Sequence, residues 1–328
     1  TADMMVLLGP ELIKDTRTAP RIMQQIDWSS GGDGIVVRKS IKSAGDLRGK
    51  TVTLAQNSPS EYYLTSLLLS AGLRPTDLKM RYTATAFEAA AAFVADKRVD
   101  ACVSWAPDIY RIPERVAGTR VLSSTSDANK LIADVYAVRA DFARDHPEIV
   151  EGLISGIFEG MDAVKQNPAP AAQWMADAFG MKADEVLSMR NDAHPTNFAE
   201  NVQFFLNASN PTNFERTWKN ASYIYRELGR IDTPIAFDKV MDFSVLQKLQ
   251  KKGAFAHHKD ESIASFTPSS FRKVTAESPI LTQTIRINFF PNSANHYEPA
   301  RDELGNPVSG KLYDPNVSAT LERVAQLS

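Results

Sequence analysis

The chain has 328 residues, of which 43% are hydrophobic and 23% are charged, and its formal net charge is -2. This composition is typical of a globular protein, and the length suggests two domains. Scattered Lys and Arg, matched by acidic residues, argue against a nucleic-acid-binding surface. No apolar run reaches the roughly 20 residues of a membrane span, and a lone Cys102, which we expect in the core, allows no internal disulfide.

Strands and helices alternate in the first part of the chain. The pattern predicts a helix over residues 2–8 and an apolar segment over 19–27. Strands are expected over residues 35–38, 50–55, 79–84, 99–105 and 119–125, with helices over 61–71 and 85–98. Gly72 ends the first of these two helices, and a capping box from Thr85 to Glu88 starts the second. The alternation indicates a parallel or mixed α/β sheet.

The rest of the chain changes character. A strand follows residue 130, a long helix covers 149–164, and the pattern stays mostly helical to 252. A polar linker, an alternating strand over 280–290, a long loop over 291–315 and a helix over 316–327 complete it. The chain has no initiator Met and ends inside a helical pattern, so we interpret it as a fragment of a longer protein.

Polar side chains gather where the predicted strands end. In α/β sheets, ligands bind beyond the carboxyl ends of the strands. Asn57, Ser58 and Ser60 begin a helix there, where capping alone and ligand contact are equally good interpretations. Trp105 and Asp108 follow a buried strand. A further polar patch, where the chain could cross between lobes, contains Ser29, Ser30 and Asp33.

Catalytic and metal-binding signals are weak. The sequence has no GxSxG, Walker, HExxH or CxxC motif. His257 and His258 lie in the polar linker, and we expect them to be solvated. We therefore predict no catalytic residues, no metal site and no cofactor.

Several stretches together resemble the periplasmic substrate-binding proteins of nitrate/sulfonate/taurine-type ABC importers, which are related to the thiamine-pyrimidine-precursor proteins. They are "DLRGKTV" before a strand, "NSPS" before a helix, "VDACVSWAPD", and "ADVYAVRADFARDHPEIVEGLISGIFEGMD". The resemblance covers roughly residues 1–252. It implies a type II binding-protein fold, in which two α/β lobes close on a ligand by hinge motion.

The resemblance also implies a domain division and a ligand site. Residues 1–39 and 128–252 would form an incomplete first lobe and 40–127 the second, followed by a linker over 253–278. By resemblance, the ligand cleft takes eight residues: Asp3, Ser30, Asp33, Asn57, Ser58, Trp105, Asp108 and Asn197.

The C-terminal stretch, residues 279–328, resembles the first strand and helix of an OmpA-like peptidoglycan-binding domain. The Asp and Arg through which that family binds peptidoglycan lie further on and are missing here. We expect peptidoglycan binding only through that missing part.

The resemblance predicts a periplasmic solute-binding protein that docks on an ABC permease and is not an enzyme. Two alternatives stay open: a cell-envelope sensor or anchor, and an enzyme like the pyrimidine-precursor synthases. The ligand is also open. Helix N-termini and Ser or Asn groups favour an oxyanion such as a sulfonate, whereas Asp33, Glu61 and Asp108 favour an amine or a zwitterion.

Overall fold

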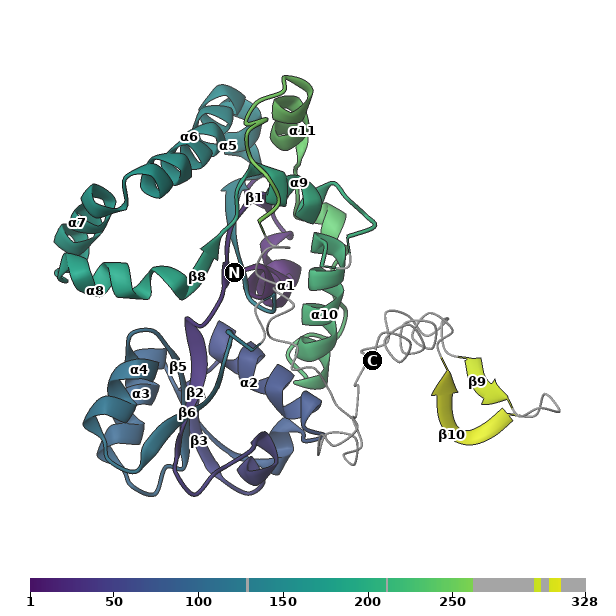
Figure 1. Cartoon of the computed structure of the whole chain (residues 1–328). Coiled ribbons are helices and arrows are strands. Elements are labelled where there is room, and N and C mark those ends of the chain that lie inside the picture. The colour runs from purple at the N-terminus through teal and green to yellow at the C-terminus, as the bar shows by residue number, and fades with distance from the viewer. Residues whose placement is uncertain (128–129, 211, 262–297, 302–306, 314–328) are drawn as a thin grey trace, which may run out of the picture. The chain divides into compact units, whose positions relative to one another are not determined.

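The computed structural model describes residues 1–127, 130–210, 212–261, 298–301 and 307–313 (Figure 1). The chain divides into two compact units, Thr1–Asp260 and Glu261–Ser328. The first unit contains two lobes, and the chain crosses between them twice, after β1 (Pro20–Ser29) and after β6 (Thr119–Ser124). Within the described residues, no helix is both long and apolar enough to span a membrane.

The second lobe, at the bottom of Figure 1, is built on a five-stranded sheet of order β4-β3-β5-β2-β6. Strand β3 runs parallel to β4 and β5, whereas β2 runs antiparallel to β5 and β6. Its other elements are β2 (Asp33–Arg38), η1 (Ala44–Leu47), β3 (Thr51–Ala55), α2 (Pro59–Ser70), η2 (Pro75–Asp77), β4 (Lys79–Thr83), α3 (Ala86–Ala95), β5 (Ala101–Trp105) and α4 (Asp108–Arg115). The mixed α/β sheet expected from the sequence is confirmed.

Local signals in this lobe act as predicted. Pro59 occupies the first turn of α2, where its missing N–H costs no helical hydrogen bond. Gly72 has φ +70°, the left-handed conformation that ends a helix. The Thr85 side chain accepts a hydrogen bond from the Glu88 backbone N–H at the start of α3. Cys102 in β5 is fully buried, as expected of a core residue.

The first lobe contains a three-stranded antiparallel sheet of order β7-β1-β8. Helices α6 to α8 extend away from this sheet, and the chain returns to it through β8 (Figure 1). Its remaining elements are α1 (Ala2–Leu12), β7 (Ala133–Arg139), α5 (Ala140–Asp145), α6 (Pro147–Gln166), α7 (Pro168–Phe179), α8 (Ala183–Ser188), η3 (Met189–Asn191), β8 (Ala193–Pro195), α9 (Phe198–Phe205), α10 (Phe214–Glu227), η4 (Phe237–Lys239) and α11 (Ser244–Lys251).

Helix α10 fastens the two lobes together. It runs beside the first lobe and reaches α2 of the second (Figure 1). The rings of Tyr62 in α2 and Tyr225 in α10 stack with centroids 5.8 Å apart, and both are buried. Just beyond α10, the Arg230 guanidinium donates a 2.7 Å hydrogen bond to Glu61 Oε1. A single large apolar cluster therefore continues from one lobe into the other.

The C-terminal part differs from the prediction. The stretch expected to be a loop contains two antiparallel strands, β9 (Glu298–Arg301) and β10 (Pro307–Tyr313). These two strands form because their backbones pair with each other, and local amino-acid composition does not reveal such pairing. The expected strand over 280–290 and helix over 316–327 lie outside the described residues.

Candidate functional site

The two crossovers between the lobes are tied to each other by short polar side chains. The Thr125 hydroxyl is buried and lies 2.7 Å from the Ser29 hydroxyl. It also accepts a 2.8 Å hydrogen bond from the Gly31 N–H. Gly32 donates its N–H to the carbonyl of Asp192, and a Cβ at Gly32 would come 2.9 Å from that oxygen. The crossover region is therefore packed too closely for a side chain at Gly32.

A cleft of about 370 Å³ opens beside these crossovers. Residues of both lobes line it. They are Thr1, Asp27, Ser29, Gly32, Asp33, Pro59, Trp105, Ala106, Ile132, Asp134, Met189, Asp192 and Ala193. The cleft thus lies at the carboxyl end of β5 and the start of α2, where ligand sites of α/β sheets form.

Two of the predicted site residues line this cleft, Asp33 and Trp105. They are direct partners in the register between β2 and β5. The Trp105 ring packs edge-on against Phe87, with centroids 5.5 Å apart. One Asp33 oxygen accepts a 2.7 Å hydrogen bond from the Ser29 hydroxyl. The sheet register therefore sets a carboxylate beside an indole.

Asn57, Ser58 and Asp108 are near the same sheet edge but do not line the cleft. Asn57 is exposed, and its N–H donates to Glu61 Oε2. Ser58 holds the N-cap position of α2, yet its hydroxyl donates to the Ala55 carbonyl and caps no helical N–H. Burial raises the pKa of Asp108, with Arg111 and Arg115 opposing that rise. Helix α2 instead presents Pro59 to the cleft.

Asp3, Ser30 and Asn197 also lie outside the lining. Asp3 is buried in the first turn of α1 and accepts a hydrogen bond from the Tyr225 hydroxyl. The Ser30 N–H donates to the Asp192 carbonyl. Asn197 caps α9: its Oδ1 accepts from the Glu200 N–H and its Nδ2 donates to the Lys259 carbonyl. Each of these three residues supports the framework around the cleft.

Glu61 does not carry the cleft charge that we assigned to it from the sequence. Its side chain is fully buried, and Oε1 accepts hydrogen bonds from Arg230 and Tyr82. Oε2 accepts the Asn57 N–H. The charge is therefore neutralised within the α2–α10 contact.

Three further aspartates line the cleft and were not among the predicted site residues: Asp27, Asp134 and Asp192. Asp27 ends an apolar segment in β1, and Asp134 interrupts an apolar one in β7. The available signal was an acidic residue next to apolar residues within a predicted strand or apolar segment. Nothing local indicated that these positions would meet.

Burial raises the pKa values of three cleft carboxylates, and neighbouring charges add to the rise for Asp27 and Asp33. Burial, with the charges of Asp134 and Asp33, raises the pKa of Asp27 to about 7. Burial, with the charges of Asp134 and Asp3, raises the pKa of Asp33 to about 6, although the Ser29 hydrogen bond opposes this. Burial also raises the pKa of Asp192, against the hydrogen bond from Tyr110. At neutral pH the cleft therefore holds negative charge at an energetic cost.

His257 is exposed to solvent, as expected, whereas His258 is not the solvated linker histidine that we expected. His258 Nε2 lies 2.8 Å from Asp162 Oδ1, and His257 Nε2 lies 3.0 Å from Oδ2. The His258 side chain is 6% exposed, and its ring stacks on Phe255. Phe255, just before the two histidines, packs against Phe158 of α6 and Phe198 of α9 in an apolar cluster, and this packing holds the segment on the first lobe. The polar composition of the segment gives no sign of this contact.

Asp162, His257 and His258 are the one group with metal-ligand proximity among the described residues. His258 Nδ1 accepts a hydrogen bond from the Phe198 N–H. The neutral ring therefore carries its proton on Nε2 and donates it to Asp162. A metal-bound histidine needs the opposite arrangement, with the non-ligating nitrogen donating. The geometry fits a structural hydrogen-bond cluster better than a metal centre.

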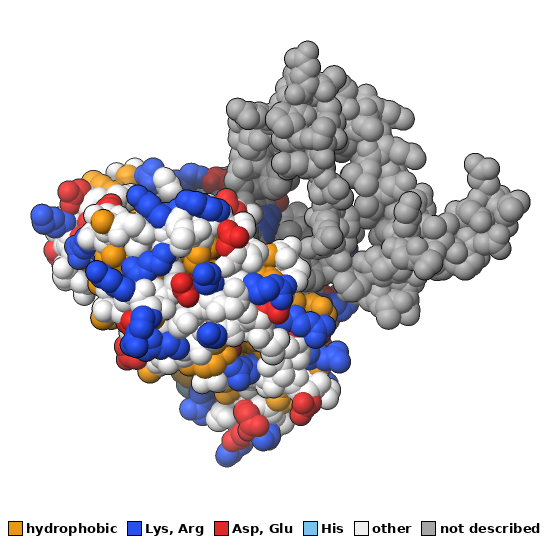
Figure 2. Space-filling model, turned by 90° about the horizontal axis from the view of Figure 1, so that it is seen from below, with side chains coloured by type: hydrophobic (Ala, Val, Ile, Leu, Met, Phe, Trp, Pro, Cys, Tyr) orange, Lys and Arg blue, Asp and Glu red, His pale blue; other side chains and the backbone are white. Residues whose placement is uncertain are grey.

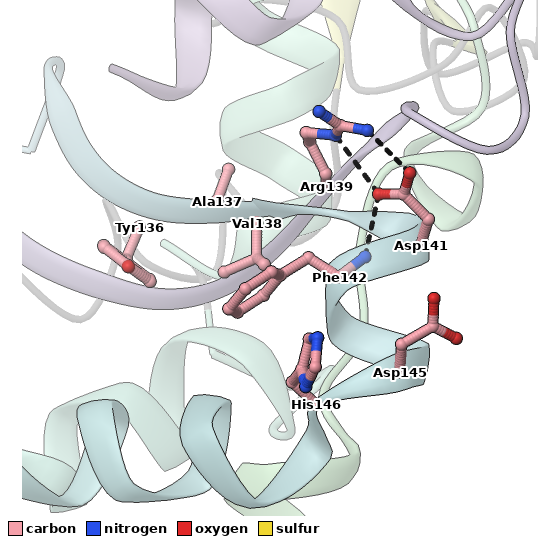
Figure 3. Close-up of a pocket in the computed structure, with 8 residues that line it drawn as sticks. All are labelled: Tyr136, Ala137, Val138, Arg139, Asp141, Phe142, Asp145 and His146. Atoms are coloured by element: carbon pink, nitrogen blue, oxygen red, sulfur yellow. Dashed lines mark hydrogen bonds and ion pairs between the residues drawn. The ribbon is translucent and has the colours of Figure 1, made fainter.

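Two other hollows lie on the first lobe. A recess of about 460 Å³ follows β7 and α5 (Figure 3), and two of its charged residues, Arg139 and Asp141, pair with each other. An apolar pocket of about 330 Å³ lies within α6 to α8, and Phe179 and Leu187 help to line it. Neither hollow combines groups from both lobes, so the interlobe cleft is the best candidate site.

Comparison with known proteins shows similarity to binding proteins. The profile of the family described as NMT1/THI5 like matches residues 29–171. A curated Escherichia coli protein, named for the binding of aliphatic sulfonates, is 28% identical over 156 residues, 48% of each chain. The chain spans less than half the length of the curated binding proteins that it matches, including one from Brucella abortus at 43%.

Solved structures establish the fold. The periplasmic aliphatic sulphonate binding protein SsuA of Escherichia coli superposes with a TM-score of 0.57 at 19% identity, covering 72% of this chain and 73% of that one. The desulfurization enzyme DSZB superposes with a TM-score of 0.56 at 15% identity, covering 76% and 84%. The first unit therefore has the fold of periplasmic binding proteins, which enzymes share.

Proposed function

We propose that this chain is the solute-binding component of an ABC importer and takes up a small solute in the interlobe cleft. The observation that carries the proposal is the cleft itself. It is lined by residues of both lobes at the crossovers, in a fold that solute receptors use. A ligand held by both lobes stabilises their closed arrangement, which is the form that a permease would receive.

Similarity to sulfonate- and taurine-binding proteins of ABC importers supports a periplasmic location and a permease as partner. The rival interpretation, a sensor or anchor of the cell envelope, would also use the cleft. Stimulation of an ABC importer's ATPase by the ligand-loaded chain would separate the two, since a sensor has no such effect.

An enzymatic function is less well supported by the residues present. DSZB shares the fold, so a reactive side chain in the cleft is the feature to look for. The one cysteine, Cys102, is fully buried in β5, and burial raises the pKa of its thiol to about 12. His194 does not line the cleft and lies 2.6 Å from Glu200. The cleft lining offers neither a thiolate nor an imidazole.

The resemblance of residues 279–328 to an OmpA-like domain stays a proposal. Its test is sedimentation of the chain with purified peptidoglycan. We expect the chain to remain in the supernatant, because the binding Asp and Arg of that family are missing from the sequence.

The proposed function is tested by ligand-induced thermal shifts across small anions, zwitterions and cations. A ligand present at 100 times its Kd adds about 2.7 kcal/mol to the stability of the folded state. Trp105→Ala should abolish the shift, because Trp105 lines the cleft. Trp174→Ala is the matched control, since Trp174 is 72% exposed on α7. Equal loss in both variants would contradict the assignment of the cleft as the site.

A further inference from the structure

The charge of the cleft differs from what an anion receptor needs. Four of its lining residues are aspartates, Asp27, Asp33, Asp134 and Asp192, and none is Lys or Arg. On the face shown in Figure 2, Lys and Arg side chains are spread over the outer surface. A sulfonate or other anion in this cleft would lose its hydration and meet carboxylates.

Two of the aspartates face each other across a strand pair. Asp27 in β1 and Asp134 in β7 are direct partners in the antiparallel register. Like charges directly opposite each other destabilise a sheet. Two positive groups act on this pair. His194 acts on Asp27 through its charge, and the amino group of Thr1 lies 3.5 Å from Asp134 Oδ1. The β1–β7 strand pair therefore contains a repulsion between carboxylates that a bound cation would relieve.

One carboxylate of the cleft, that of Asp192, also keeps free hydrogen-bonding capacity. Asp192 Oδ2 is buried and has no hydrogen-bond partner among the described residues, while Oδ1 lies 3.0 Å from the Tyr110 hydroxyl. Buried acceptors in proteins are normally satisfied. Donors supplied by a ligand would complete them.

The spacing of these groups fits an organic cation better than a metal ion. Among the described residues, the cleft carboxylates do not form a trio whose oxygens lie within 4.8 Å of one another. The cleft also has apolar walls, Trp105, Ile132 and Met189. A cation near an indole face gains favourable electrostatic energy, and Trp105 stands opposite Asp33.

We propose that the solute of this cleft is a small organic cation, an amine whose ammonium group binds among Asp27, Asp33 and Asp134 and whose alkyl part lies against Trp105. This inference rests on the proposed function and specifies its substrate class. It separates the chain from the sulfonate-binding proteins that it resembles. Two or more ammonium groups would use the separated carboxylates better than one.

Calorimetric titration of the whole chain at pH 8 and low salt tests this inference. The probes are butylamine and butanesulfonate, which share an alkyl chain and differ in charge, together with 1,4-diaminobutane and taurine. We expect butylamine to bind at least tenfold more tightly than butanesulfonate, and 1,4-diaminobutane more tightly still. Asp27→Asn and Asp134→Asn should each weaken 1,4-diaminobutane at least tenfold. Asp232→Asn, at an exposed position outside the cleft, should leave it unchanged.

The outcomes separate this inference from the proposed function. Tighter binding of butanesulfonate or taurine than of the amines would overturn the cation inference and support a solute receptor of another class. Amine binding that Asp27→Asn and Asp134→Asn leave intact would place the cation elsewhere and overturn it too. If no probe of either charge binds the folded chain, both proposals fail. Circular dichroism of each variant verifies that it is folded.

Discussion

Burial of Asp27 and its repulsion by Asp134 predict that removing the Asp27 charge stabilises the ligand-free protein. The pKa of Asp27 is raised to about 7 from its ordinary 3.8. Because the folded state binds this proton more tightly than the unfolded state, stability decreases as pH rises from about 4 to about 7. A shift of about three pKa units corresponds to about 4 kcal/mol, an upper bound for the cost at pH 8.

The net gain from Asp27→Asn should be smaller than this bound. The Asp134 side chain is 47% exposed, so water screens part of the repulsion. The new amide also needs hydrogen-bond partners of its own. We expect a gain of about 1–3 kcal/mol at pH 8, and about 2–4 °C in Tm for each kcal/mol. At pH 5 the gain should be clearly smaller, because Asp27 is then mostly protonated in the folded state.

Thermal unfolding of the ligand-free chain at pH 5 and pH 8 measures this effect. Asp134→Asn should stabilise in the same direction, and the double variant should gain less than the sum of the two, because each change relieves the same repulsion. Asp232→Asn is the surface control. Loss of stability in Asp27→Asn, to the same extent at both pH values, would refute the reasoning, since Asp27 would then make a stabilising contact.

Three further predictions concern the cleft and the contacts that hold the lobes. Affinity for butylamine should rise at least tenfold from pH 5 to pH 8 in calorimetry, because Asp27 and Asp33, with pKa values of about 7 and 6, become charged. The charges of Asp134, Asp3, His194 and the Thr1 amine also act on one or both of these carboxylates. Affinity independent of pH would contradict this prediction. Arg230→Ala should lower the free energy of unfolding, measured with denaturant, by about 2–4 kcal/mol, because it leaves the buried Glu61 carboxylate without its cation. The control Arg226→Ala, on the exposed face of α10, should leave the free energy of unfolding nearly unchanged. In the double variant Tyr110→Phe, Arg111→Ala, the radius of gyration measured by small-angle scattering should increase. The reason is that Tyr110 binds Asp192 of the first lobe and Arg111 binds Glu185 of the same lobe. An unchanged radius of gyration would show that these two contacts do not hold the lobes together.

Much of the framework could be predicted from local sequence. Pro59 and Gly72 mark the ends of α2, and the Thr85 cap starts α3, because capping depends on residues within one turn. The buried β5 strand and the alternating α/β pattern likewise follow from neighbouring residues. The prediction of Asp33 and Trp105 at a strand edge rested on the same short-range signals, and both residues line the cleft.

The charge of the site could not be predicted in this way. Asp27 and Asp134 lie far apart in the chain and meet only through the β1–β7 register, and Asp192 reaches the cleft only because β8 returns the chain to β1. Glu61 looked like a cleft residue until α10 brought Arg230 beside it. Local patterns determine where strands and helices begin and end, whereas long-range strand pairing and helix packing decide which charges share a cavity and which neutralise each other.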